Sequence, residues 1–144
     1  MGNVESGTGR TASSAAYESL VDAFNASGKY ASNECRILLV RLRGHLVLRI
    51  EGKAQQRDFR DFATEVRPIL ATRRLKGLIV DLSMCESIAS PAIGLVAFVM
   101  MEANRSGATI HLIRAKETVM RSLNVMGLSG IYKSHDSIDD VVGE

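Results

Sequence analysis

The segment that most constrains the fold of this chain is the run from Gly77 to Gly94. It opens with the apolar run 78–80, which is typical of a strand buried on both faces of a sheet. A polar stretch from Asp81 to Ser87 follows, and then Ser90 and Pro91 precede a second apolar run. Serine favours a helix N-cap and proline the first helical position, so the segment predicts a strand, a loop and a helix capped by Ser90. The free N–H groups of such a helix start can hold an anion, or present a serine whose charge changes.

Strand and helix patterns alternate on both sides of this segment. Two β-rich runs, 37–42 and 46–50, flank a tight turn at Gly44 and predict an antiparallel hairpin. Apolar residues from Phe59 to Leu70 recur at helical spacing. The later elements are expected as a helix over 92–104, a strand over 109–113, a helix over 119–126, a short strand at 131–132 and a last helical turn over 137–142. The order predicts an α/β fold, a mixed sheet of four to five strands with helices packed mainly on one face.

The first part of the chain differs in composition from the rest. Residues 1–33 are rich in serine, alanine, glycine and asparagine, and predict an N-terminal arm that is flexible or holds one short helix near Tyr17 and Phe24. Residues 34–144 then form the domain. We expect the arm to be dispensable for folding, because it has few apolar residues to offset the entropy of ordering. The alternative is that its apolar residues cover the helix at 92–104.

Composition argues against several classes of function. Aromatic residues make up 5% of the chain and the net charge is +2, so no nucleic-acid partner is expected. Two cysteines do not form a disulfide scaffold, and His45, His111 and His135 are scattered, so no metal site is expected. We find no catalytic constellation, no cofactor motif, no apolar run of membrane-spanning length and no signal peptide. These observations predict a cytoplasmic protein that is not an enzyme.

Four pieces of sequence resemble one family when they are read in order. They are Arg49–Gly52 at a strand end, Ile79–Ser83 in the central strand, Ser90–Gly94 at the helix start and Met120–Tyr132 in the late helix and its Gly-Leu turn. From about Cys35 to the C-terminus the chain resembles the STAS domain of bacterial anti-sigma factor antagonists. The resemblance implies the same mixed α/β fold.

The resemblance also implies a switch and shows where this chain departs from it. In regulatory members, a kinase-type anti-sigma factor phosphorylates the second serine of an Asp-Ser-Ser-Gly motif, and the added charge ends one complex. Matched residue by residue, Ala89 stands at the aspartate, Ser90 at the first serine, Pro91 at the phosphoacceptor and Ala92 at the glycine. Ser90 is then either a displaced acceptor or a structural N-cap. Pro91 is either a mimic of a locked state or a helix starter.

The function that the resemblance implies is a protein-interaction module in a partner-switching pathway of transcription regulation. Its partner would be an anti-sigma factor or a GHKL-type serine kinase. The expected docking loop comprises Ser83, Ser87, Ser90, Pro91, Ala92 and Ile93, and the expected partner-helix surface comprises Val96, Met100 and Met101. The surplus apolar surface of that helix is either this exposed patch or is covered within the chain. The alternative function is a ligand-sensing or scaffold STAS module that binds a small anion or nucleotide at the Ser90 helix start.

Overall fold

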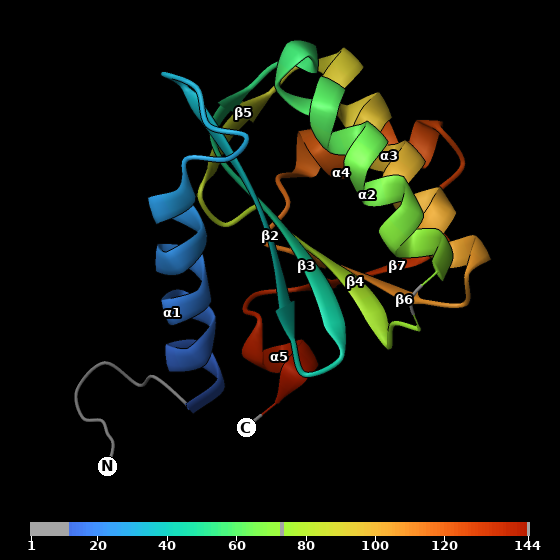
Figure 1. Cartoon of the computed structure of the whole chain (residues 1–144). Helices are drawn as coiled ribbons and strands as arrows, with labels where there is room; N and C mark the ends of the chain where they lie inside the picture. Colours follow the sequence, from blue (N-terminus) through green and yellow to red (C-terminus); the bar gives the residue numbers. More distant parts are fainter. Residues whose placement is uncertain (1–11, 73, 144) are drawn as a thin grey trace.

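The computed structural model describes residues 12–72 and 74–143, in which a mixed sheet carries helices on both faces (Figure 1). The elements in chain order are α1 (Ala12–Ser27), β2 (Cys35–Leu42), β3 (His45–Ala54), a 3-10 turn (Gln56–Phe59), α2 (Arg60–Thr72), β4 (Gly77–Asp81), β5 (Cys85–Ile88), α3 (Ser90–Arg105), β6 (Thr109–Ile113), α4 (Glu117–Val125), β7 (Tyr132–His135) and α5 (Asp139–Val142). The predicted α/β class is confirmed.

The sheet follows the order β2-β3-β4-β6-β7, and β5 pairs with β3 outside this path. The hairpin of β2 and β3 is antiparallel, and its two-residue turn has positive φ at Arg43 (50°) and Gly44 (83°), as a type I′ turn requires. All other pairings are parallel. The carboxyl ends of the parallel strands therefore meet at one edge of the sheet, which is where ligand and partner sites of such sheets form.

A short strand, β5, lies where the sequence predicts a polar turn. It pairs with the far end of β3 across a register shift at Gly52. Gly52 has a φ of 84°, and a Cβ there would lie 2.2 Å from the carbonyl oxygen of Glu34, so only glycine fits. The extra residue at this shift lies in β5, because Gly52 pairs with Cys85 and Lys53 with Ser87. The pairing continues to Ala54, whose carbonyl accepts a hydrogen bond from Ala89 N–H at 2.9 Å. The chain is thus held in place up to the residue before α3.

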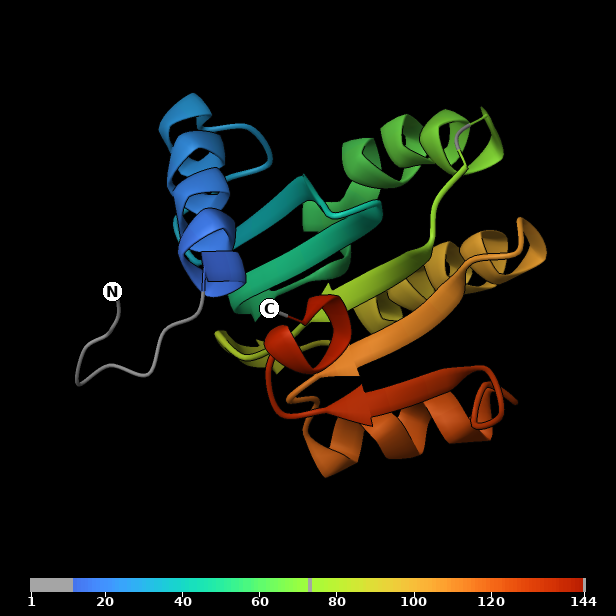
Figure 2. The same cartoon turned by 90° about the horizontal axis from the view of Figure 1, so that it is seen from below.

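Two separate apolar cores lie on the two faces of the sheet. Figure 2 shows the helices that cover each face. The larger core packs α2, α3 and α4 against one face, and its largest fully buried side chains include Phe59, Phe62 and Met100. The prediction of helices mainly on one face is therefore confirmed. The smaller core lies under α1 and α5, where Tyr17 and Val21 pack with sheet residues.

A buried polar cluster ties α1 to the sheet. The hydroxyl of Tyr17 donates a hydrogen bond of 2.5 Å to Oδ2 of Asp81, and both side chains are almost fully buried, at 3% and 2% exposure. The guanidinium of Arg49 lies 3.8 Å from the same oxygen and donates from Nε to Glu51 at 2.8 Å. Burial and the Asp81 carboxylate raise the pKa of the Tyr17 phenol, which therefore stays protonated and donates. This cluster joins α1, β3 and β4.

The contacts of α1 change what we expect of the N-terminal part of the chain. Tyr17 and Val21 face the sheet beside Leu38 and Val40, on the side away from α3. Helix α1 therefore does not cover α3, and its removal would expose the smaller core. We now expect truncation before Cys35 to destabilise the fold, in contrast to the expectation from composition.

Replacing Tyr17 with phenylalanine tests the polar cluster. We expect Tyr17→Phe to lower the free energy of unfolding by about 1–3 kcal/mol, because Asp81 would lose a buried hydrogen-bond donor. Denaturant unfolding followed by circular dichroism measures the change. Tyr132→Phe is the matched control: it removes an exposed hydroxyl that bonds Asn124 at 2.7 Å, and should cost less than about 0.5 kcal/mol. Equal losses in the two variants would contradict the assigned role of Tyr17.

Candidate functional site

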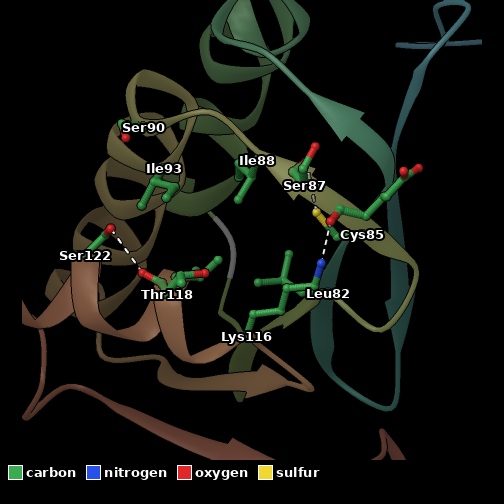
Figure 3. A pocket seen from close by; sticks show the side chains of 11 residues that line it. Leu82, Cys85, Ser87, Ile88, Ser90, Ile93, Lys116, Thr118 and Ser122 are labelled. Carbon is green, nitrogen blue, oxygen red and sulfur yellow. Dashed lines mark hydrogen bonds between the residues drawn. The ribbon is translucent and has the colours of Figure 1, made fainter.

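A pocket of about 240 Å³ opens where β5 leads into α3 and β6 leads into α4 (Figure 3). It is lined by Leu82, Cys85, Glu86, Ser87, Ile88, Ser90, Ile93, Lys116, Thr118, Val119 and Ser122. In Figure 3, Ile88 and Ile93 lie between β5 and α3, and Lys116 and Thr118 lie on the α4 side. The pocket thus has an apolar inner wall and a polar mouth at the carboxyl edge of the sheet.

The predicted docking loop divides into surface and core residues. Ser87 and Ser90 line the pocket and are exposed, as is Pro91 beside them. Ser83 is exposed in the turn after β4, where its N–H donates to Oδ1 of Asp81 at 2.9 Å, and it does not line the pocket. Ala92 and Ile93 are buried at 0% and 5% exposure and belong to the larger core. Both side chains are therefore too buried to present a docking surface, although Ile93 forms part of the pocket wall.

Helix α3 begins one residue earlier than the sequence predicts. Its N-cap is Ala89, in extended backbone (φ −69°, ψ 148°), so Ser90 is the first helical residue and Pro91 the second. The prediction that Ser90 caps the helix is therefore wrong. The physical reason is β5: its pairing with β3 continues to Ala54 and holds Ala89 by a backbone hydrogen bond, so the helix starts directly after it.

The predicted partner-helix surface is also corrected. Val96 and Met100 are buried at 4% and 0% exposure in the larger core, because α3 packs between α2 and α4 and against the sheet. Met101 is exposed at 39%, and the sequence analysis overlooked Phe98, which is exposed at 36%. The outward face of α3 thus presents Phe98 and Met101 instead of Val96 and Met100.

Helix α4 supplies residues that the sequence analysis did not assign to the site. Lys116 is its N-cap and donates from Nζ to the carbonyl oxygen of Glu86, while Thr118 and Ser122 line the pocket. The signal was present in the sequence: a strand at 109–113 followed by a helix must bring its loop to the same sheet edge as the Ser90 loop.

The electrostatics of the pocket favour an anion over a catalytic nucleophile. The N-termini of α3 and α4 carry partial positive charge, and Lys116 adds a full one. Burial raises the pKa of the Cys85 thiol, so this cysteine stays protonated at neutral pH and is a poor nucleophile. Glu86 also lines the pocket, and its carboxylate lies 4.0 Å from the Lys53 ammonium. The pocket therefore offers a lysine, two helix starts and hydroxyl groups to an anion, beside one paired carboxylate and without an activated side chain.

The three histidines expected to be scattered lie in a row. The His111 ring centroid lies 6.0 Å from that of His45 and 5.1 Å from that of His135, and Nδ1 of His111 is 3.0 Å from Nε2 of His135. Parallel pairing of the strands brings them together, and Gly77 leaves room between His45 and His111. Burial, with nearby positive charge, lowers the pKa of His111 to about 4, so it is neutral at pH 7.

The described part of the chain has neither a cluster of metal ligands nor a helix that could span a membrane. No group of three or more histidine, cysteine, aspartate or glutamate side chains within residues 12–72 and 74–143 is placed to hold a metal ion. Over the same residues, every helix is too short or too polar to cross a membrane.

Comparison with protein families gives a match over most of the domain. A family model described as "Mlab, STAS domain" matches residues 37–133, which include every strand of the sheet at least in part and the whole pocket. The matched range leaves out α1 and α5, the two helices on the smaller core.

Solved structures give the same result for the fold. The anti-sigma factor antagonist SpoIIAA in its unphosphorylated form has a TM-score of 0.59 and 17% identity, covering 72% of this chain and 91% of that chain. The Bacillus cell fate determinant SpoIIAA in its phosphorylated form has a TM-score of 0.61 and 15% identity, covering 73% and 96%. An anti-sigma factor antagonist from Mycobacterium paratuberculosis has a TM-score of 0.60 and 16% identity, covering 76% and 92%. At these identities the likeness is one of fold.

The weak N-cap of α3 can be improved. Ala89 has N-cap backbone angles but no side-chain oxygen, so Ala89→Asp should raise the free energy of unfolding by about 1 kcal/mol. Ser90→Ala is the control and should change stability by less than about 0.5 kcal/mol, since Ser90 is not the cap. Thermal and denaturant unfolding measure both variants. A loss of about 1 kcal/mol in Ser90→Ala would restore Ser90 as the cap.

Proposed function

This chain belongs to the STAS domain family, and on that basis we propose that it is a non-enzymatic protein-interaction module of the anti-sigma factor antagonist type. Its partner is a kinase-type anti-sigma factor or a GHKL-type serine kinase in a cytoplasmic partner-switching pathway. The partner contacts the exposed loop and helix start formed by Ser83, Ser87, Ser90 and Pro91. The observation that carries the proposal is the exposed start of α3, which is held at a fixed position by β5.

Rigid presentation suits a recognition surface. The backbone of β5 is paired with β3, and Ala89 is bonded to Ala54, so little ordering entropy remains to be lost when a partner binds this loop. The neighbouring side chains Ser87 and Ser90 offer hydroxyl groups, and Pro91 adds apolar surface.

Regulation in this chain differs from the family's switch under this proposal. Pro91 occupies the acceptor position and has no hydroxyl, so it cannot carry a phosphate. Ser90 precedes it by one residue, and one residue turns a side chain about 100° around a helix axis, away from where a positioned kinase site would reach. The partner complex is then controlled by competition or by the abundance of the partners.

A second candidate function is favoured by the pocket itself. Lys116, three serines and the starts of two helices meet around a volume that accommodates a small anion or a phosphate group. A ligand-sensing STAS module would bind its ligand there, beside the Ser90 helix start. This function and partner binding use overlapping surfaces, because Ser87 and Ser90 belong to both.

Restoring the acceptor tests the first proposal. After incubation with a cognate kinase and ATP, we expect the wild-type chain to gain no stoichiometric phosphate, and Pro91→Ser to be phosphorylated at residue 91. Tandem mass spectrometry identifies the modified residue, and Pro91→Ala is the control that changes the helix without adding a hydroxyl. Stoichiometric phosphoserine at Ser90 in the wild type would overturn the unswitched mode of regulation. Failure of the folded chain to bind any such kinase would overturn the proposed partner class.

Ligand-dependent melting tests the second candidate. If the pocket binds an anion, inorganic phosphate or ATP should raise the melting temperature in a saturable way, since a ligand of the folded state stabilises it. Lys116→Met should abolish the shift, while Lys76→Met, which removes an exposed lysine before the amino end of β4 and outside the pocket, should keep it. No saturable shift with either probe would rule out phosphate recognition here.

A further inference from the structure

A second concave surface lies between α2 and α3, apart from the pocket at the sheet edge. It is a depression of about 420 Å³ lined by Gln56, Arg57, Phe59, Arg60 and Leu95. Phe59 is buried in the core below it, while Arg57 and Arg60 are exposed at its rim. The depression therefore combines an apolar floor with positive charge.

The charges of α2 are sorted onto two edges of the helix. Arg60 and Arg67 are seven residues apart and share the edge that faces α3, where Arg67 lies 5.7 Å from the ring centroid of Phe98. On the opposite edge, Glu65 is bonded by the hydroxyl of Tyr30 and by Lys29 at 3.4 Å. No carboxylate within the described residues forms an ion pair with Arg60 or Arg67. The edge of α2 that faces α3 therefore presents two exposed guanidinium groups that an anionic partner can bind.

The side of α3 that faces this edge of α2 is apolar and partly exposed to solvent. Phe98 is 36% exposed and Leu95 is half-buried beside the depression. Glu102, the acidic residue of this helix, already pairs with Arg105 at 2.8 Å. A Cβ added at Gly94 would meet no atom within 4 Å, so packing within the chain gives no reason for a helical glycine that costs about 1 kcal/mol relative to alanine. Close approach of another backbone would supply such a reason.

We call the depression together with the neighbouring Arg67 and Phe98 the α2–α3 groove. We propose that this groove binds an acidic amphipathic helix of the partner protein. Its apolar side chains cover Leu95 and Phe98, and its carboxylates pair with Arg60 and Arg67. This inference rests on the proposed interaction function and specifies the chemistry of the partner segment.

The spacing of the two arginines defines the occupant further. Seven residues of helix span about 10.5 Å, so carboxylates seven residues apart on a helix running alongside α2 match both guanidinium groups. Apolar residues three and four positions after the first carboxylate lie on the same face, above Phe98. An anionic membrane fits less well, because a bilayer surface does not enter a concave groove.

Two peptides of about 18 residues, long enough to form helices, test the groove against the full chain. Both carry the same leucines; the acidic one has glutamates seven residues apart and the basic one has lysines there. We expect the acidic peptide to bind at least about tenfold more tightly by fluorescence anisotropy, and more weakly as salt rises. Amide shifts in NMR should centre on residues 94–101.

Charge reversal supplies the matched control. The double variant Arg60→Glu, Arg67→Glu should bind the acidic peptide at least about tenfold more weakly than the wild type. The control variant Arg41→Glu, Lys133→Glu makes the same change in net charge at exposed strand positions and should keep the wild-type affinity. Unfolding curves establish that both double variants are folded. Equal binding of the two peptides, equal effects of the two variants, or preference for vesicles of anionic phospholipid over the acidic peptide would overturn the inference.

Measuring how tightly the kinase binds the wild type and the arginine variant distinguishes failure of this inference from failure of the proposed function. If the kinase binds the wild type and the Arg60→Glu, Arg67→Glu variant equally, the groove inference fails and the interaction function stands. If the acidic peptide binds the groove but no kinase binds the chain, the partner class fails and the groove stands.

Discussion

The rest of the structure depends on the interactions of the buried Asp81 carboxylate. A carboxylate at 2% exposure is costly unless hydrogen bonds and opposite charge surround it. Here the Tyr17 hydroxyl in α1 and the N–H of Ser83 after β4 donate to it, and the Arg49 guanidinium in β3 forms an ion pair with it at 3.8 Å. Docking of α1 is therefore coupled to the start of the loop that leads to the candidate site. Removing α1 would take the Tyr17 hydroxyl from this buried carboxylate, so the packing of α1 is coupled to the stability of the sheet.

The second constraint is the bulge at Gly52, which acts on the functional surface. The pairing of β3 with β5 starts there and continues to Ala54, whose carbonyl bonds the Ala89 N–H directly before α3. Since a Cβ at Gly52 would collide with the Glu34 backbone, the position of Ser90 and Pro91 depends on a glycine far from them in sequence. Part of the candidate loop is thus an extra strand of the sheet, which explains how an exposed segment keeps one shape.

The sequence located the candidate site but misjudged which of its side chains reach the surface. Ser87, Ser90 and Pro91 lie together at the start of α3, as the strand-loop-helix pattern predicts. Val96 and Met100 were assigned to a surface and lie in the core, because helical periodicity shows that a helix has an apolar side without showing how wide the buried sector is. That width depends on neighbours, and α3 has a helix on either side. The same holds for Lys116 at the pocket and for Arg60 and Arg67 beside α3: helix packing between segments remote in sequence places them there.

By itself, the sequence determined the class of fold, the order of its main elements and the place of the loop at residues 83–91, because apolar periodicity, turn residues and the alternation of strand and helix are local signals. It also determined that residue 91 has no hydroxyl. Only the tertiary structure decided that α1 covers the far face of the sheet, that three histidines form a row and that Ala89 is the N-cap of α3. It also decided that Arg60 and Arg67 lie on the edge of α2 that faces α3. Each of these depends on strand register or helix packing between residues distant along the chain, and no local pattern encodes such a distance.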